Sequence, residues 1–120
     1  LAMVDLEDVA TAAATILTEP DFQNAVFELA GPDNLTQTEV ADILSDVLRR
    51  PVQIEQISAR RWAKNARAAG LGDYQIETLL KMFDYYQQYH FRGNGKVLRW
   101  LLKQPPTDFR EFVERIGQQP

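Results

Sequence analysis

The chain has 120 residues, of which 45% are hydrophobic and 25% charged, a composition typical of one globular domain with a hydrophobic core. Its net charge of −4 argues against a nucleic-acid partner, because such binding depends on concentrated Lys and Arg. It has no cysteine and no apolar run of about 20 residues, which excludes disulfides, thiolate chemistry and a membrane-spanning helix.

The first predicted helix follows Asp5 and ends near Leu17. Its apolar residues recur at three- and four-residue spacing and predict one buried stripe: Leu6, Val9, Ala10, Ala13, Ile16 and Leu17. Asp5 is a natural N-cap, and Asp8 adds negative charge at the positive end of the helix dipole. These two carboxylates could also form a catalytic pair, but capping explains both, and we favour that interpretation.

Two short strands are predicted on either side of the second helix. Residues 25–30 (AVFELA) and 52–57 combine aromatic or β-branched residues, and the first stretch ends at Gly31. Between them Thr36 and Glu39 fit a capping box, so the helix begins there and ends before Pro51. Strand, helix and strand within about 35 residues is the size of a βαβ unit, so we expect two parallel strands.

Four further helices are predicted in the second half of the chain. One follows Ser58 and ends at Gly70, and a longer one follows Asp73 and ends near Tyr89. Residues 97–102 resume a helical pattern, and Thr107 caps the last helix. The sequence therefore predicts six helices.

The long helix after Asp73 carries two apolar stripes. The first comprises Ile76, Leu79, Leu80 and Phe83, and the second comprises Met82, Tyr85, Tyr86 and Tyr89. At 100° per residue the stripes are displaced by about a third of a turn or more, so one face cannot bury both. The first stripe suffices to anchor the helix, and the second predicts either core packing or a cleft wall or interface.

No motif for catalysis or cofactor binding is complete. Gly93-Asn94-Gly95-Lys96 lacks the earlier Gly and the following Ser or Thr of a phosphate loop. No G-x-G-x-x-G follows a strand, and no Tyr has Lys four residues later. His90 is the only histidine, and its place at a predicted helix end favours a capping charge over a catalyst or a metal ligand. We therefore predict no catalytic, cofactor-binding or metal-binding residue in this chain.

One basic cluster leaves two interpretations open. It consists of Arg49, Arg50, Arg60, Arg61 and Arg67, with Trp62 among them. A solvated face is the default, and an anion-binding rim is the alternative.

The sequence resembles the C-terminal portion of NmrA-like proteins, which are atypical members of the short-chain dehydrogenase/reductase superfamily. The resemblance rests on residues 4–10 (VDLEDVA), 27–32 (FELAGP) followed by Leu35-Thr36, 50–52 (RPV), and 97–102 (VLRWLL) running to 105–109 (PPTDF). The family usually has Gly where this chain has Arg49, and often where it has His90. The helices that end at these two residues are therefore expected to be strained or differently capped.

The resemblance implies a parent protein with an N-terminal Rossmann domain that binds NAD(P), absent from this chain, which begins at Leu1 in place of Met. Residues 1–120 would be a single domain, the substrate-binding lobe. We expect an α+β fold, mostly helical with about six helices and a small two-stranded parallel sheet. The leading function is the lobe of a cytoplasmic NAD(P)-dependent oxidoreductase acting on quinone-like acceptors.

Two alternatives stay open at this point. The lobe could belong to a non-catalytic NAD(P) redox sensor that binds a regulatory protein, or it could be an autonomous interaction module. In every case the fragment alone is not expected to be catalytic or to bind a cofactor, nucleic acid or a membrane. Its substrate-cleft candidates are Met82, Tyr85 and Tyr89, with Trp62 as a neighbour, and this uncovered patch predicts that the fragment self-associates.

Overall fold

The computed structural model describes residues 1–117, and its ordered elements are helices. They are α1 (Leu6–Thr18), a short 3₁₀ turn η1 (Pro20–Phe22), α2 (Gln37–Val47), α3 (Ala59–Ala68), α4 (Asp73–Tyr89), α5 (Gly95–Leu102) and α6 (Phe109–Gly117). The predicted six helices and their order are confirmed. None of those in the described part is long and apolar enough to cross a bilayer.

The chain divides into two compact units. The first unit comprises Leu1–Gln53 with Arg92–Pro120, and the second, the hairpin unit, comprises Ile54–Phe91. Each unit has a hydrophobic cluster of its own. The expectation of one substrate-binding lobe over residues 1–120 therefore stays a prediction.

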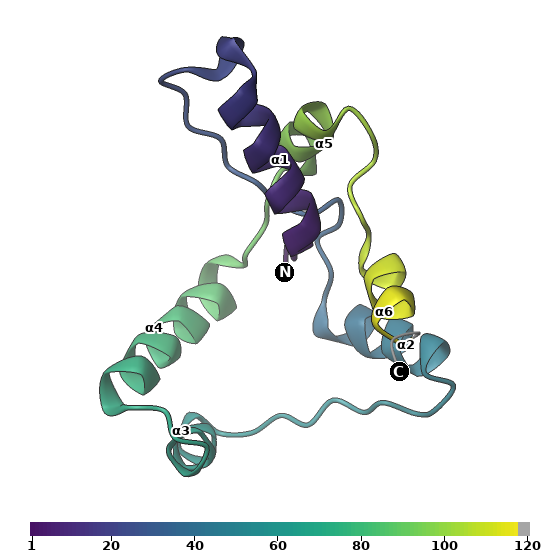
Figure 1. Ribbon diagram of the computed structural model, residues 1–120. Coiled ribbons are helices and arrows are strands. Elements are labelled where there is room, and N and C mark those ends of the chain that lie inside the picture. Colours follow the sequence, from purple (N-terminus) through teal and green to yellow (C-terminus); the bar gives the residue numbers. More distant parts are fainter. Residues whose placement is uncertain (118–120) are drawn as a thin grey trace. The chain divides into compact units, whose positions relative to one another are not determined.

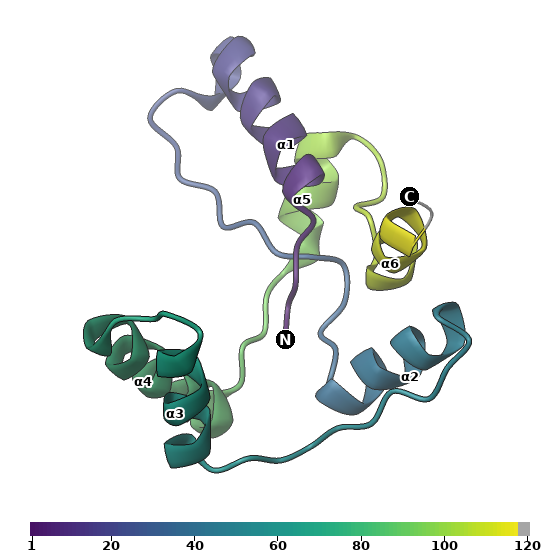
Figure 2. The same cartoon turned by 60° about the horizontal axis from the view of Figure 1, so that its bottom comes forward.

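In the first unit α1 lies beside α5, and α2 lies beside α6 (Figures 1 and 2). The core between α1 and α5 is formed by Ala12, Leu98 and Leu101, all almost fully buried. Partly buried apolar residues surround it, namely Val4, Ile16, Phe22, Phe27, Leu29, Val97 and Leu102. Ala12 has a small side chain, which lets the two leucines of α5 approach the backbone of α1 closely.

Hydrogen bonds fix the start of α1. Asp5 Oδ1 accepts from the backbone N–H of Glu7 at 3.1 Å, and Asp5 Oδ2 accepts from Arg115 at 2.6 Å. Asp8 Oδ2 accepts from the backbone N–H of Thr107 at 2.7 Å. The capping interpretation of Asp5 is thus confirmed, and Asp8 holds the segment that enters α6.

The predicted buried stripe of α1 is mostly wrong. Leu6 is 79% exposed and Leu17 85% exposed, while the buried positions are Asp8 and Ala12. The helix is rotated because Asp8 is bonded to Thr107 and Ala12 faces α5. These are contacts with residues about 90 positions away or more, which local spacing does not reveal.

The N-terminus of α2 agrees with the sequence. Thr36 Oγ1 accepts from the backbone N–H of Glu39 at 3.2 Å, and Glu39 Oε2 accepts from the backbone N–H of Thr36 at 2.7 Å. The predicted capping box is confirmed. The hydrogen bonds that Thr36 donates lower the pKa of the Glu39 carboxyl.

The predicted two-stranded parallel sheet is not confirmed, because no residue among 1–117 belongs to a strand. Both segments, 25–30 and 52–57, lack regular structure, and no backbone hydrogen bond joins them. In the first segment Phe27 and Leu29 pack against the α1–α5 core, whereas Ile54 in the second is 53% exposed. Alternating burial therefore reflects packing on helices, which needs no hydrogen-bonded ladder.

Close backbone packing explains the glycines of the loop before α5. A Cβ atom on Gly95 would lie 2.6 Å from the carbonyl oxygen of Gly31, and one on Gly93 would lie 2.2 Å from Cβ of Ala30. The backbone N–H of Gly93 also donates a hydrogen bond to Asn34 Oδ1 at 3.0 Å. This loop resembles a phosphate loop in composition, but its glycines are needed for contact between segments of the chain itself.

Three helices in the described part end at non-glycine residues with positive φ, and one of these residues is Lys103 after α5. The departures from the family pattern predicted a strained or differently capped end at the other two. Arg49 after α2 has φ 51°, and His90 after α4 has φ 60° with ψ 161°. Residues other than glycine rarely adopt the φ and ψ angles of His90. His90 also donates its backbone N–H to the carbonyl of Tyr86 at 2.9 Å, so it occupies the predicted helix end.

Candidate binding surface of the hairpin unit

The four predicted site residues all lie in the hairpin unit, on α3 and α4. Ser58 caps α3 by accepting from the backbone N–H of Arg61 at 3.2 Å. Gly70, with φ 93°, then turns the chain toward α4. Gly72 precedes α4 as its N-cap, in place of the predicted Asp73, which is the first helical residue and pairs with Arg67 at 2.8 Å.

The two helices pack through a small core. Ala63, Ala66 and Ile76 are buried, with Trp62, Leu71 and Leu80 partly buried around them. The Trp62 ring meets the Phe83 ring edge-on, with centroids 4.9 Å apart and an interplanar angle of 90°. Trp62 is thus a packing residue of the hairpin, and its ring contact on α4 is with Phe83.

The second half of α4 carries a continuous aromatic surface. Tyr85 and Tyr89 are 58% and 59% exposed, and their ring centroids lie 4.8 Å apart at an interplanar angle of 43°. Tyr86 is half-buried and lies 4.9 Å from the ring of Phe91. Met82 is half-buried one turn before Tyr86. We call Met82, Tyr85, Tyr86, Tyr89 and Phe91 the aromatic face.

The geometry separates the two stripes of α4 as the spacing predicted. Ile76 and Leu80 pack toward α3, whereas Tyr85 and Tyr89 point away from the hairpin core. Two adjacent phenol rings offer flat apolar surface with polar edges. Such a surface suits a planar, conjugated ligand or a partner helix, and its role stays a prediction.

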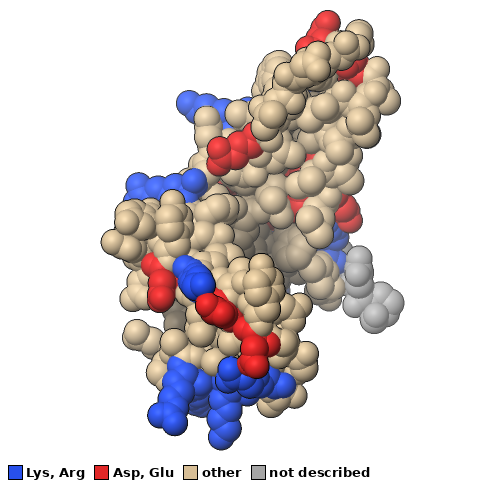
Figure 3. Space-filling view, turned by 90° about the vertical axis from the view of Figure 1, so that its left-hand side faces the viewer, with Lys and Arg blue, Asp and Glu red and all other residues tan. Residues whose placement is uncertain are grey.

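Basic residues are exposed along α3. Arg60, Arg61, Lys64 and Arg67 are exposed, and this helix contains no acidic residue; the Lys and Arg side chains at the bottom of Figure 3 lie over it. Arg61 pairs with Glu55 at 2.6 Å, and Arg67 pairs with Asp73. Exposed pairs of this kind contribute little, so the solvated-face interpretation suffices. Arg49 and Arg50 belong to the first unit.

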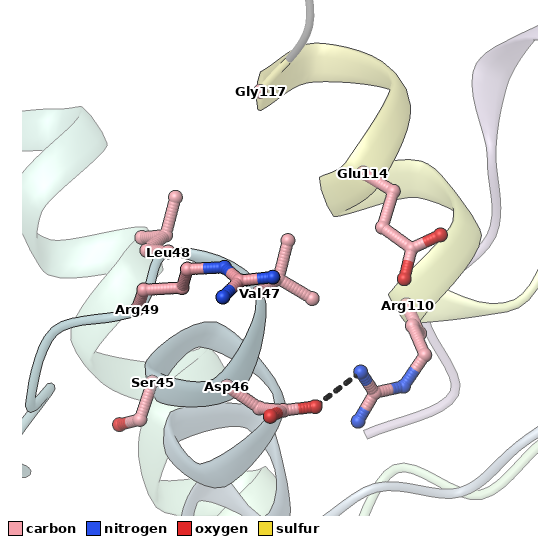
Figure 4. A pocket seen from close by; sticks show the side chains of 8 residues that line it. All are labelled: Ser45, Asp46, Val47, Leu48, Arg49, Arg110, Glu114 and Gly117. Atoms are coloured by element: carbon pink, nitrogen blue, oxygen red, sulfur yellow. Dashed lines mark hydrogen bonds and ion pairs between the residues drawn. The ribbon is translucent and has the colours of Figure 1, made fainter.

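The first unit contains a separate open groove between α2 and α6, with a volume of about 840 Å³ (Figure 4). Asp46 and Arg110 form an ion pair of 2.5 Å across it, and this hydrogen bond raises the pKa of Arg110. Ser45, Val47, Leu48, Arg49, Glu114 and Gly117 complete its lining. None of the four predicted cleft residues lies there, and of the predicted basic cluster only Arg49 lines the groove.

Within residues 1–117 no three His, Cys, Asp or Glu side chains are placed to hold a metal ion. NAD(P) does not fit the residues present either. Within the described residues, the loop that resembles a phosphate loop is filled by the backbone of Gly31 and Pro32, which lie 2.6 and 3.0 Å from where a Cβ on Gly95 would stand. Dinucleotide sites need such glycines free for close approach of the pyrophosphate.

Comparison with known proteins gives one similar curated protein and several similar structures. No protein-family model matches the chain. The NAD(P)H azoreductase of Xenophilus azovorans is 23% identical over 111 residues, which cover 92% of this chain. The NADPH-dependent quinone oxidoreductase of Escherichia coli has the same fold over 98% of the chain, with a TM-score of 0.84 and 25% identity. The Citrobacter sp. triphenylmethane reductase in complex with NADP(H) matches over 96%, with a TM-score of 0.80 and 25% identity.

The chain spans about two fifths of the length of these proteins. It covers 39% of the azoreductase, 43% of the quinone oxidoreductase and 40% of the triphenylmethane reductase. The fold is therefore that of one portion of NAD(P)H-dependent reductases.

Proposed function

We propose that the chain is the C-terminal, substrate-binding lobe of a longer NmrA-like, NAD(P)H-dependent oxidoreductase, located in the cytoplasm, that acts on quinone-like acceptors. The exposed ring pair of Tyr85 and Tyr89 carries the proposal. Support comes from the similar proteins, whose names give a quinone, azo and triphenylmethane dyes as substrates. Quinones and these dyes share conjugated ring systems.

The role assigned to this chain is binding and orientation. A planar acceptor can stack on one exposed phenol ring, and the polar edge of the other can donate a hydrogen bond from its hydroxyl to an acceptor carbonyl. Met82 would add an adaptable apolar contact beside them. Trp62 would act indirectly, by holding α4 through Phe83. The nucleotide would be bound by the remainder of the longer protein, since no loop described here accommodates it.

The first test is titration of the 120-residue chain with menadione, a naphthoquinone, followed by tyrosine and tryptophan fluorescence. Replacing both Tyr85 and Tyr89 by Leu should weaken binding by about tenfold or more, because each lost ring contact is worth about 1 kcal/mol. Tyr74→Leu is the matched control, since Tyr74 lies on the same helix, is 82% exposed and is outside the aromatic face. Equal binding by all three proteins would overturn the assignment.

The alternative role of the aromatic face is an interface between two copies of the chain. Tyr85 and Tyr89 replaced by Ser should leave the fold of the chain intact while any self-association, measured by sedimentation, is lost. If the wild-type chain is a monomer and the double variant unfolds, the face is core and the proposal fails.

An activity assay of the longer protein distinguishes a reductase from a redox sensor. NADPH oxidation in the presence of menadione supports the reductase, whereas NADP(H) binding without turnover of any quinone supports a regulatory lobe. As a control, calorimetric titration of the 120-residue chain with NADPH should detect no binding in the micromolar range, because residues 1–117 offer no glycine loop open to a pyrophosphate.

A further inference from the structure

The four asparagines of the chain differ in the residue that follows them. Asn94 precedes Gly95, whereas the others precede alanine or leucine, namely Asn24, Asn34 and Asn65. An asparagine side chain loses its amide when the backbone nitrogen of the next residue attacks its Cγ atom, and glycine has no Cβ to hinder that approach. All four asparagines are exposed, so the following residue and the local hydrogen bonds decide which of them reacts.

The hydrogen bonds around Asn94 hold its side chain beside a free backbone nitrogen. Asn94 is the N-cap of α5, and its Oδ1 accepts from the backbone N–H of Lys96 at 3.1 Å. This bond keeps the side chain folded over the peptide group of Gly95, and it stabilises the negative charge that develops on Oδ1 during the attack. Gly95 is the first residue of α5, so its N–H has no acceptor within the helix. No other residue among 1–117 accepts from it either.

The surroundings of Asn34 and Asn65 oppose the same attack. After Asn34, the backbone N–H of Leu35 donates to the carbonyl of Leu1 at 3.0 Å. The Asn34 side chain is itself held by two hydrogen bonds with the backbone of Gly93, at 3.0 and 3.4 Å. Asn65 lies inside α3, where the N–H of the next residue belongs to the helix hydrogen bonds.

We propose that Asn94 is a site of spontaneous deamidation in the folded chain. The nitrogen of Gly95 forms a bond to Cγ of Asn94, the bond from Cγ to Nδ2 breaks, and ammonia leaves with the proton of the Gly95 N–H. Water then opens the resulting succinimide ring at either carbonyl. One opening gives aspartate, and the other gives isoaspartate, in which the main chain runs through the side chain. Water is the only co-reactant, and the reaction is independent of the proposed oxidoreductase function.

The two products should affect α5 differently. Aspartate keeps a side-chain oxygen at the N-cap and adds negative charge at the N-terminus of the helix, which is favourable. Isoaspartate instead adds a methylene group to the main chain before Gly95. That residue is closely packed, because a Cβ on it would lie 2.6 Å from the carbonyl oxygen of Gly31 and 3.0 Å from Cα of Pro32. The added group should therefore displace the start of α5, which carries Leu98 and Leu101 of the first unit's core.

Peptide mapping by mass spectrometry tests the site, with the 120-residue chain incubated in mildly alkaline buffer. Asn94 should convert about tenfold faster than each of the other three asparagines, which corresponds to a barrier lower by about 1.4 kcal/mol. Equal or slower conversion of Asn94 would overturn the proposal. Conversion of Asn94 in urea but not in the folded chain would overturn it as well.

The consequence for α5 is tested on the aged chain. The fraction that contains isoaspartate should melt at a lower temperature, and its amides should exchange faster in α1 and α5 but not in α3 and α4. Asn94→Asp reproduces the aspartate product and should melt with the fresh wild-type chain. Asn94→Ser is the matched control, because serine caps a helix and has no amide to lose, so the same incubation should leave its melting temperature unchanged. An equal loss in the serine variant, or no loss in the isoaspartate fraction, would overturn the proposed effect on α5.

Discussion

The first unit and the hairpin unit are stabilised by contacts of different range in the sequence. In the first unit Asp5 bonds to Arg115 and Asp8 to Thr107, 110 and 99 positions apart, and α1 packs on α5. In the hairpin unit α3 and α4 are consecutive helices joined by a tight turn at Gly70. The first unit therefore needs the two ends of its chain together, whereas the hairpin unit closes locally.

The hydrophobic cores of the two units also differ in the size of their buried side chains. Leu98 and Leu101 are almost fully buried in the first unit, while the hairpin core contains two alanines and Ile76 as its buried residues. A larger apolar core gives more free energy of unfolding, since burial scales with apolar area. We expect the first unit to be the more stable of the two and the hairpin unit to unfold as a separate local element.

The largest expected effect is that of Leu98→Ala. Truncating a fully buried leucine removes its transfer free energy and leaves a cavity, which costs about 2–5 kcal/mol. Amide exchange should increase in α1 and α5 and stay unchanged in α3 and α4, because Leu98 belongs to the cluster between α1 and α5.

Ile76→Ala is the matched change in the hairpin unit, where Ile76 is 2% exposed. It should increase exchange in α3 and α4 only. If either variant increases exchange in both units equally, the two cores are one cooperative unit and the comparison is wrong.

The same difference in range explains which features the sequence could predict. The caps at Thr36 and Ser58, the turn at Gly70 and the two stripes of α4 depend on residues within a few positions, and they were predicted. The buried face of α1 depends on Thr107 and α5, and its prediction was wrong. Strand pairing is also non-local, and the predicted pairing of residues 25–30 with residues 52–57 was not confirmed.

An intermediate effect is expected at the two N-caps. Thr36→Ala should lower the free energy of unfolding by about 1 kcal/mol in urea titration, because the N-cap hydrogen bond to Glu39 is lost. Ser58→Ala should cost less, since α3 has Arg61 at the position of Glu39 and no reciprocal side-chain bond is formed. Equal losses would show that the hydrogen bond from Thr36 Oγ1 to Glu39 Oε2 contributes nothing.

Acid should reduce the contribution of Thr36 to the free energy of unfolding. The pKa of Glu39 is lowered in the folded chain, so its contribution is present above the ordinary pKa of a glutamate and is lost as the pH falls through the lowered value. The loss caused by Thr36→Ala should therefore be smaller at low pH than at pH 7. The loss caused by Ser58→Ala should be less dependent on pH.

The smallest effect, that of Arg49→Gly, concerns one of two helix ends that have the same hydrogen bonds. After α2, the backbone N–H of Arg49 donates to the carbonyl of Asp46 and that of Arg50 to the carbonyl of Ser45, each at 3.3 Å. After α3, the backbone N–H groups of Gly70 and Leu71 donate in the same pattern, each at 3.0 Å. This pattern needs positive φ at its central residue, which is Arg49 in the first unit and Gly70 in the hairpin unit. Glycine adopts that conformation without a clash of Cβ.

Exchanging the residue types should therefore shift stability in opposite directions. Arg49→Gly should raise the free energy of unfolding by about 0.5 kcal/mol, because relief of strain outweighs the greater freedom of glycine in the unfolded chain. Gly70→Ala should lower the stability of the hairpin unit by about 1 kcal/mol, although a Cβ there would meet nothing within 4 Å. Urea unfolding and amide exchange measure both changes. If Arg49→Gly destabilises the chain instead, the Arg49 side chain stabilises the groove shared with Asp46 and Arg110, and its positive φ is retained for that contact.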